Sequence, residues 1–216
     1  MKVLVVDVGG THVKLLATGR RVPLKLESGP TLTPARMVRD VLRATADWRY
    51  DVVTIGYPGP VVRGRPAREP HNLGGGWRRF DFRRAFGCPV RILNDAAMQA
   101  LGSYDRGRML FLGLGTGLGT AIVDEGGVQA LELAHLPYRN GDSFEDWIGV
   151  RGLERVGVRK WRKHVAIIAE MLRAATNADH VVLGGGNVKK LERMPPHCRR
   201  GDNRFAFRGG FRAWHE

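Results

Sequence analysis

Leu4-Val5-Val6-Asp7-Val8-Gly9-Gly10-Thr11-His12-Val13-Lys14 is the stretch of sequence that predicts most about the fold. An apolar run typical of a strand enters the glycine pair, and a second apolar run leaves it. Glycine tolerates a positive φ and lets another group approach the backbone closely. The stretch therefore predicts a strand-turn-strand hairpin with a polar tip.

A second glycine-rich turn lies in Leu110-Phe111-Leu112-Gly113-Leu114-Gly115-Thr116-Gly117-Leu118-Gly119-Thr120-Ala121. Consecutive backbone N–H groups at such a tip can bind an anion, and the hydroxyls of Thr11 and Thr116 add donors. Either turn alone is equally typical of an ordinary β-turn. The two together, with Asn94-Asp95 between them, favour a phosphoryl-transfer site divided between two similar half-domains.

The composition indicates a globular chain with a core of its own. With 216 residues, 43% of them hydrophobic, the chain is long enough for one large domain or two small lobes. No stretch approaches the roughly 18 apolar residues of a membrane helix, and the N-terminus lacks signal-peptide features. We therefore expect a cytoplasmic protein with no membrane partner. Cys88 and Cys198 have neither zinc-ligand spacing nor the pattern of a disulfide framework.

The chain is strongly basic, with a formal net charge of +14. Residues 151–216 carry 15 Lys and Arg against 6 Asp and Glu, whereas residues 1–150 carry 20 against 15. Such a balance predicts a polyanionic partner, or a surface that tolerates one. Aromatic residues are not interleaved with the basic ones, and no nucleic-acid-binding module is recognisable. Nucleic acid is therefore not the favoured partner.

The periodicity beyond the first hairpin predicts a β-β-α-β order. Thr33-Pro34 combines an N-cap with proline at the first helical position, ahead of apolar residues at helical spacing. Residues 63–79 read as a long loop rich in Gly, Pro and Arg, and such loops are usually functional or disordered. The second half repeats the plan of the first. The other predicted elements are strands at 52–56, 90–93 and 181–183, helices at 80–86 and from 96 to about 104, and an amphipathic helix at 159–175.

Taken in order along residues 2–190, these motifs resemble those of the ROK family of sugar kinases, most closely its polyphosphate-type glucokinases. The zinc-binding Cys-rich motif common in that family is absent between His135 and Glu145, as it is in the polyphosphate-type branch. The matched motifs are Asp7-Val8-Gly9-Gly10-Thr11 with Lys14, Asn94-Asp95-Ala96, Gly113–Thr120, Glu132-Leu133-Ala134-His135, and Val182-Leu183-Gly184-Gly185-Gly186.

The resemblance implies an α/β chain with the two-lobed actin-like ATPase (ribonuclease H-like) fold and a cleft between its lobes. The N-terminal lobe would comprise residues 1–94, with 198–216 packing back on it, and the C-terminal lobe residues 95–197. The implied activity is that of a hexokinase or glucokinase. With Mg²⁺ and without zinc, it would transfer a phosphoryl group from ATP or inorganic polyphosphate to the 6-hydroxyl of glucose or a related hexose. The positive charge favours polyphosphate, and a homodimer is an assembly that the resemblance allows.

The same resemblance assigns a role to each motif. Asp95 would be the general base that takes the proton of the sugar hydroxyl, and Asp7 would hold Mg²⁺, directly or through water. The implied sugar-binding residues are Asn72, Asn94, Asp95, Glu132, His135 and Glu145. The implied phosphate-binding residues are Asp7, Gly9, Gly10, Thr11, Lys14, Gly115, Thr116, Gly117, Gly184, Gly185 and Gly186.

Structural interpretations of these residues stay open beside the functional ones. Asn94-Asp95 suits the N-cap of the helix that follows, Lys14 suits a solvated strand, and Glu132 with His135 suits a surface pair. The alternative functions are a non-catalytic sugar-binding or regulatory ROK protein, and a protein that binds polyanions such as nucleic acid. Intact motifs favour the enzyme, and a first motif so near the N-terminus disfavours a repressor with an N-terminal helix-turn-helix.

Overall fold

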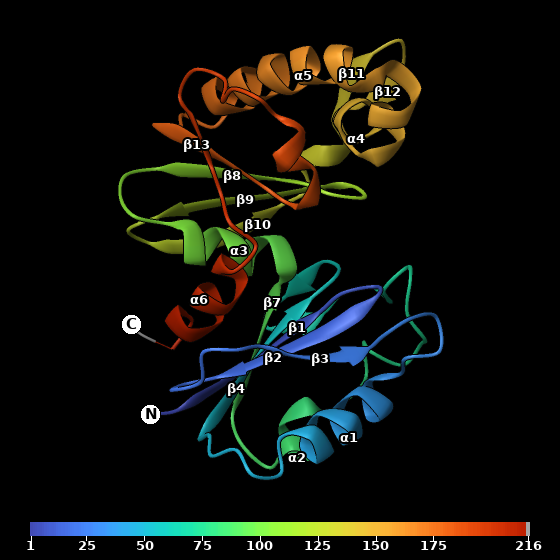
Figure 1. Ribbon diagram of the computed structural model, residues 1–216, viewed down its shortest axis with the longest axis vertical. Coiled ribbons are helices and arrows are strands. Elements are labelled where there is room, and N and C mark those ends of the chain that lie inside the picture. The colour runs from blue at the N-terminus through green and yellow to red at the C-terminus, as the bar shows by residue number, and fades with distance from the viewer. Residues whose placement is uncertain (215–216) are drawn as a thin grey trace. The chain divides into compact units, whose positions relative to one another are not determined.

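The computed structural model describes residues 1–214, which divide into two compact units. The first unit comprises residues 1–98 and the segment that starts at Ala206, and the second comprises residues 99–205. The boundary between residues 98 and 99 falls within the helix that follows Asn94. Each unit is built on one five-stranded sheet, as Figure 1 shows.

The sheet of the first unit has the strand order β3-β2-β1-β4-β7. The three strands β1, β2 and β3 are antiparallel, whereas β4 and β7 extend the sheet parallel to β1. The elements are β1 (Val3–Val8), β2 (His12–Ala17), β3 (Leu24–Glu27), α1 (Pro34–Ala44), β4 (Val52–Tyr57), β5 (Val61–Val62), β6 (Arg65–Pro66), α2 (Phe82–Phe86), β7 (Val90–Asn94), the first turn of α3 (Asp95–Ser103) and nearly all of α6 (Phe205–Arg212). The predicted hairpin at the start of the chain is confirmed.

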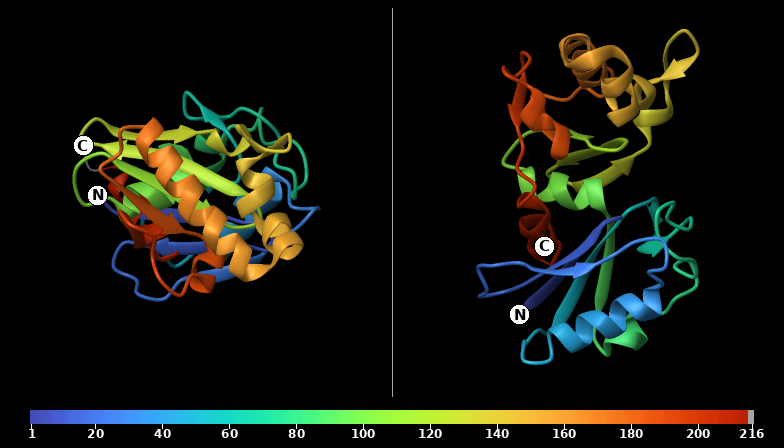
Figure 2. Two further views of the ribbon diagram at one scale, coloured as in Figure 1. Left: turned by 90° about the horizontal axis from the view of Figure 1, so that it is seen from above. Right: turned by 45° about the vertical axis from the view of Figure 1, so that its right-hand side comes forward.

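Alternation along β1 places apolar side chains on both faces of this sheet. Leu4 and Val6 lie in one buried cluster with side chains of α1 and α2. Val3 and Val5 lie in another, with Met98 and side chains of α6. Figure 2 shows α1 running along one face of the sheet. Apolar side chains that alternate along the strand therefore pack against the apolar faces of helices, and the sheet has a buried core on each side.

Helix α1 begins where its sequence predicts. Thr33 has an extended backbone, and its hydroxyl accepts the N–H of Arg36 at 3.3 Å. Pro34 occupies the first turn, where a missing N–H leaves no hydrogen bond unmade. The apolar stripe of the helix, which includes Met37 and Val41, is buried against the sheet.

The second unit repeats the plan of the first, with the strand order β10-β9-β8-β13-β14. Here β8, β9 and β10 are antiparallel, and β13 and β14 continue parallel to β8. The predicted architectural repeat is therefore confirmed. The elements are the rest of α3, β8 (Met109–Leu114), β9 (Leu118–Asp124), β10 (Gly127–Leu131), the 3₁₀ turn η1 (Leu133–His135), β11 (Pro137–Arg139), β12 (Asp142–Ser143), α4 (Phe144–Ile148), α5 (Val150–Ala175), β13 (His180–Gly184), the 3₁₀ helix η2 (Gly186–Lys190) and β14 (Cys198–Arg200).

Helix α5 covers one face of this sheet through Trp161, Val165, Ile168 and Leu172, all buried. The stripe predicted from the sequence also included Ala175, which is exposed at the end of the helix. Helical backbone begins at Val150, and the predicted start at Arg159 matches the second of the two segments into which α5 divides. Gly157 interrupts it with φ 74° and ψ 157°, so the apolar period restarts after that glycine. Within residues 1–214, none of the helices has the length and apolar character needed to span a membrane.

Candidate active site

The first glycine turn presents a paired carboxylate. The register of β1 and β2 sets Asp7 directly opposite Lys14, and Asp7 Oδ2 lies 3.7 Å from Lys14 Nζ. Burial raises the pKa of the Asp7 carboxyl, and the positive charge of Lys14 acts in the opposite direction. Lys14 thus forms an ion pair with the partly buried Asp7 carboxylate and is not simply a solvated strand residue.

Both turns use glycine to leave space. None of the glycines at the two tips has a positive φ, so the left-handed backbone that glycine would permit is not used. A Cβ on Gly9 would lie 3.0 Å from the carbonyl oxygen of His12, and one on Gly10 would lie 3.5 Å from Cβ of Asn72. The close approach that the sequence predicts is confirmed, and it brings Asn72 beside the first turn.

Ser28, just beyond β3, fastens the first turn and was missed in the sequence. Its hydroxyl donates to the carbonyl oxygen of Gly9 at 2.6 Å, and its N–H donates to the carbonyl oxygen of Thr11 at 3.1 Å. Because these two oxygens are held by one residue, the tip between them is ordered from both ends. A lone serine after a short strand carries no local signal of this role.

The Asn94-Asp95 pair lies where β7 ends and α3 begins. Asn94 Oδ1 accepts the N–H of Ala97 at 3.1 Å, which makes Asn94 the helix cap, and its Nδ2 donates to the carbonyl oxygen of Gly59 at 3.0 Å. Asp95 Oδ1 accepts the N–H of Ala96 at 2.8 Å. The cap interpretation is therefore right for Asn94, and it orients the carboxylate that follows.

Gly56 lies on β4, the strand between Asp7 on β1 and the end of β7, which Asp95 follows. The register pairs Asp7 with Gly56 and Gly56 with Leu93, so Asp7 lies level with the end of β7. Two strand spacings of about 4.8 Å separate their backbones by about 10 Å. A Cβ on Gly56 would overlap the end of the Met98 side chain and lie 3.5 Å from Asp7 Oδ1. The sequence showed Gly56 only as the end of a buried strand.

Glu145 holds the second glycine turn. Its Oε2 accepts the N–H of Leu118 at 3.0 Å, and a Cβ on Gly117 would overlap that same oxygen. The N–H of Gly115 closes the turn by donating to the carbonyl oxygen of Gly117 at 3.1 Å. One donor beside the predicted phosphate nest is therefore taken by a side chain 27 residues further along the chain.

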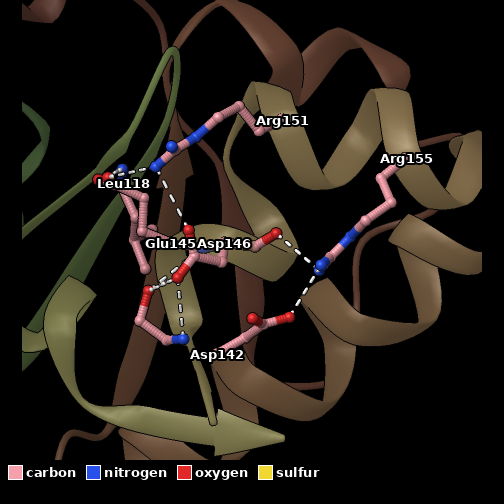
Figure 3. A network of polar contacts seen from close by, with 7 residues as sticks. Leu118, Asp142, Glu145, Asp146, Arg151 and Arg155 are labelled. Atoms are coloured by element: carbon pink, nitrogen blue, oxygen red, sulfur yellow. Dashed lines mark hydrogen bonds and ion pairs between the residues drawn. The ribbon is translucent and has the colours of Figure 1, made fainter. Parts of the chain in front are cut away.

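A network at the start of α4 fixes the position of Glu145, as Figure 3 shows. Ser143 and Asp146 form a reciprocal capping box, and the hydrogen bonds from Ser143 lower the pKa of the Asp146 carboxyl. Arg151 Nη2 lies 3.3 Å from Asp146 Oδ1 and 3.9 Å from Glu145 Oε1. Arg155 binds Asp142 at 2.8 Å. With the helix start fixed in this way, the Glu145 carboxylate is aimed at the turn.

The third glycine motif lies against the second turn. Gly185 has φ 81°, and a Cβ there would lie 2.5 Å from the carbonyl oxygen of Leu114. Only glycine suits both conditions. Asn187 Nδ2 donates to the carbonyl oxygen of Gly115 at 3.0 Å, a contact that the sequence did not predict. The structure thus brings Gly184–Gly186 and Gly115–Gly117 together within the second unit.

Glu132 and His135 form a surface pair. Glu132 precedes the 3₁₀ turn η1 and His135 is its last residue, with Glu132 Oε2 lying 3.5 Å from His135 Nε2. Their side chains are 62% and 68% exposed, so neither is committed to the core. The two side chains lie on the same side of a turn that is 3₁₀ and not α-helical.

Comparison with known proteins agrees with the motifs. No family model matches the chain. It is 27% identical over 214 residues to the polyphosphate glucokinase of Mycobacterium tuberculosis, which covers 88% of this chain and 80% of the relative. The inorganic polyphosphate/ATP-glucomannokinase from Arthrobacter matches with a TM-score of 0.80 at 20% identity, over 97% of this chain and 96% of that one. A ROK hexokinase from Thermus thermophilus matches with a TM-score of 0.75 at 23% identity, over 97% and 96%. The predicted fold class is thereby confirmed.

Proposed function

We propose that this protein, a ROK sugar kinase by its fold and a relative of the polyphosphate glucokinases by its sequence, phosphorylates the 6-hydroxyl of glucose or a related hexose. Asp7 and Asp95 carry the proposal, because both stand at the carboxyl ends of parallel strands in one sheet. Phosphoryl transfer needs a base near the attacking hydroxyl and positive charge near the phosphates. At this end of the sheet, the Asp95 carboxylate can act as the base, and the Asp7 carboxylate can hold a cation that supplies the positive charge.

Asp95 acts as the general base in this proposal. One of its oxygens is held by the N–H of Ala96, and the cap made by Asn94 fixes the helix start beneath it. As the sugar oxygen bonds to phosphorus, its proton passes to the Asp95 carboxylate, and the bond between phosphorus and the donor's bridging oxygen breaks. A positioned base of this kind contributes about 10²–10⁴-fold in rate.

Asp7 suits a Mg²⁺ ion, held directly or through water. Mg²⁺ keeps several waters and binds one or two carboxylates together with substrate phosphates, so a single acid meets its need. A cation beside Asp7 would favour the ionised carboxylate that burial disfavours. When bound, the ion would neutralise charge on the donor phosphates.

The donor is inorganic polyphosphate or ATP, and the charge of the chain favours polyphosphate. A net charge of +14 attracts a long polyanion over many residues, an advantage that one nucleotide cannot use. The proposed donor-binding glycines of the second unit are Gly115 and Gly117 with Gly184–Gly186, which the Asn187 hydrogen bond holds together. In the first unit, the turn of Gly9, Gly10 and Thr11 would contact the transferred phosphate.

We propose sugar ligands in each unit separately. Asn72 borders the first turn, and Asn94 and Asp95 follow β7. Glu132 and His135 offer an exposed pair. Oε1 of Glu145, 3.9 Å from Arg151 Nη2, would accept a sugar hydroxyl while Oε2 holds the turn. We place the reaction in the cytoplasm, as the composition predicts. A homodimer stays a prediction, which light scattering of the purified protein would test.

A matrix of donors against hexoses, assayed on purified protein, tests the proposed function. Asp95→Asn should lower kcat with glucose by about 10²–10⁴-fold while glucose binding survives, because the amide keeps the shape but cannot accept the proton. Asp47→Asn, on a side chain that is 77% exposed, is the matched control and should leave kcat unchanged. Wild-type turnover in the Asp95 variant would exclude it as the base. No turnover with any donor by the wild-type protein would favour the sugar-binding alternative.

A further inference from the structure

We propose that α5 and η2 form a binding site for the distal phosphates of an inorganic polyphosphate chain. The site, here called the α5–η2 basic surface, consists of Arg159, Lys163, Lys189, Lys190 and Arg193, all of them exposed. The inference rests on the proposed function, because it extends the donor site of that reaction. It assigns a ligand class to residues that none of the glycine or carboxylate motifs includes.

Arg162 joins the two elements into one surface. Its Nε donates to the carbonyl oxygen of Lys190 at 2.6 Å, and its Nη1 lies 2.6 Å from Glu192 Oε1. Arg159 precedes Arg162 by three residues, and positions three apart lie on the same side of a helix. Arg162 therefore holds this part of α5 against η2, and we infer that the exposed cations of the two elements form one surface.

The charge on this surface is uncompensated. Residues 159–163 and 189–193 contain seven Lys and Arg and a single acid, Glu192, which Arg162 already pairs. In the part of the chain that the structure describes, no carboxylate lies within ion-pair distance of the five residues of the α5–η2 basic surface. Elsewhere on the same unit Arg155 pairs with Asp142 and Arg173 with Glu170. Concentrated positive charge without acidic partners attracts an extended polyanion.

The surface begins where the proposed donor site ends. Helix η2 starts at Gly186, and Asn187 ties it to the second glycine turn through Gly115. A 3₁₀ helix rises about 2 Å per residue, so Lys189 and Lys190 lie about 6–8 Å along the axis from Gly186. A chain of many phosphates can continue from the glycine turns over η2, whereas ATP replaces that continuation with a nucleoside.

Residues 159–163 and 189–193 offer no exposed aromatic ring on which a nucleic-acid base could stack. Single-stranded nucleic acids bind where exposed aromatic rings alternate with basic residues. The one Trp, Tyr or Phe within residues 159–163 and 189–193 is Trp161, which is fully buried in the core of the unit. Charge without a stacking platform favours a polyanion that has no bases.

The test compares Lys189→Ala/Lys190→Ala with the matched control Lys2→Ala/Lys25→Ala. Both double variants lose two exposed positive charges. Lys2 and Lys25 both lie in the other unit, Lys2 just before β1 and Lys25 on β3. An exposed charge contact changes affinity about two- to fivefold, so the first variant should bind long-chain polyphosphate about tenfold more weakly. Its kcat/KM for polyphosphate relative to ATP should fall by the same factor. Lys189→Arg/Lys190→Arg should restore both.

Direct titration with long-chain polyphosphate keeps the inference testable without turnover, and thermal unfolding verifies that each variant is folded. Equal loss of polyphosphate affinity in the control variant, or no loss in the η2 variant, would overturn the proposal. Competition by single-stranded DNA of equal charge at equal affinity would overturn it too, because the surface would then bind polyanions in general. A wild-type protein that uses ATP but does not bind polyphosphate would refute this site and leave the sugar kinase intact. A wild-type protein that binds polyphosphate at η2 but phosphorylates no sugar would refute the proposed function alone.

Discussion

Alanine at Gly117 should destabilise the second unit, whereas alanine at Gly115 in the same turn should not. A methyl group at Gly117 would overlap Oε2 of Glu145 and lie 3.1 Å from its Cδ. The carboxylate would have to move, and its hydrogen bond from Leu118 N–H at 3.0 Å would be lost. A hydrogen bond to a charged group contributes about 1.5–3 kcal/mol. Because the Glu145 side chain is 27% exposed, solvent screening lowers the expected loss to about 1–2 kcal/mol.

Thermal unfolding of the single variants and of the double variant Gly117→Ala/Glu145→Ala measures this effect. A loss of 1 kcal/mol lowers Tm by about 2–4 °C in a chain of this size, so Gly117→Ala should lower it by about 2–8 °C. A Cβ on Gly115 meets nothing within 4 Å, and its φ is not positive, so Gly115→Ala should be neutral or stabilising by up to about 1 kcal/mol. In the double variant the carboxylate is already gone, so the two losses should not add. Additivity within about 0.5 kcal/mol would refute the contact between Gly117 and Glu145 as the cause.

Three further predictions concern the first unit. Asp7→Asn should abolish most kinase activity yet stabilise the ligand-free protein at neutral pH. Burial raises the pKa of Asp7, so its contribution to stability is present below the ordinary pKa of Asp and lost as the pH rises through the raised value. Melting curves at pH 4 and pH 8 should show that decline in the wild type and a smaller one in the variant. Gly210→Ala in α6 would press a methyl group into Val5, which should lower the free energy of unfolding by about 1–3 kcal/mol. The higher helix propensity of alanine should restore about 1 kcal/mol of this loss, and urea unfolding measures the sum. Thr33→Ala removes the cap of α1 and should cost about 1 kcal/mol in the same assay, whereas an unchanged midpoint would exclude that cap as a contributor.

Much of the fold could be predicted because its signals are local. The glycine pair between two apolar runs specifies a hairpin wherever it stands, and Thr33-Pro34 specifies a helix start without reference to the rest of the chain. The stripe of Trp161, Val165 and Ile168 likewise reports a buried helix face through its spacing alone. The start predicted at Arg159 follows the break at Gly157, and the helical segment before that glycine was missed because it is too short to show an apolar period.

The candidate site divides in the same way. Residue types and their order indicated Asp7, Asp95 and the glycine turns, since phosphoryl transfer demands carboxylates and accessible backbone at set positions. The partners of these residues could not be predicted. Ser28 fastens the first turn and Asn187 the second, and both contacts depend on how strands far apart in the sequence are paired.

The sequence by itself determined that two glycine turns and an Asn-Asp pair would lie at strand ends, because each is specified by its immediate neighbours. The tertiary structure alone decided what the glycines are for. At Gly117 the missing side chain makes room for the carboxylate of Glu145, and at Gly56 for Met98 and Asp7. Close packing between distant segments creates these requirements, and no local pattern encodes the distance between two atoms that the fold brings together.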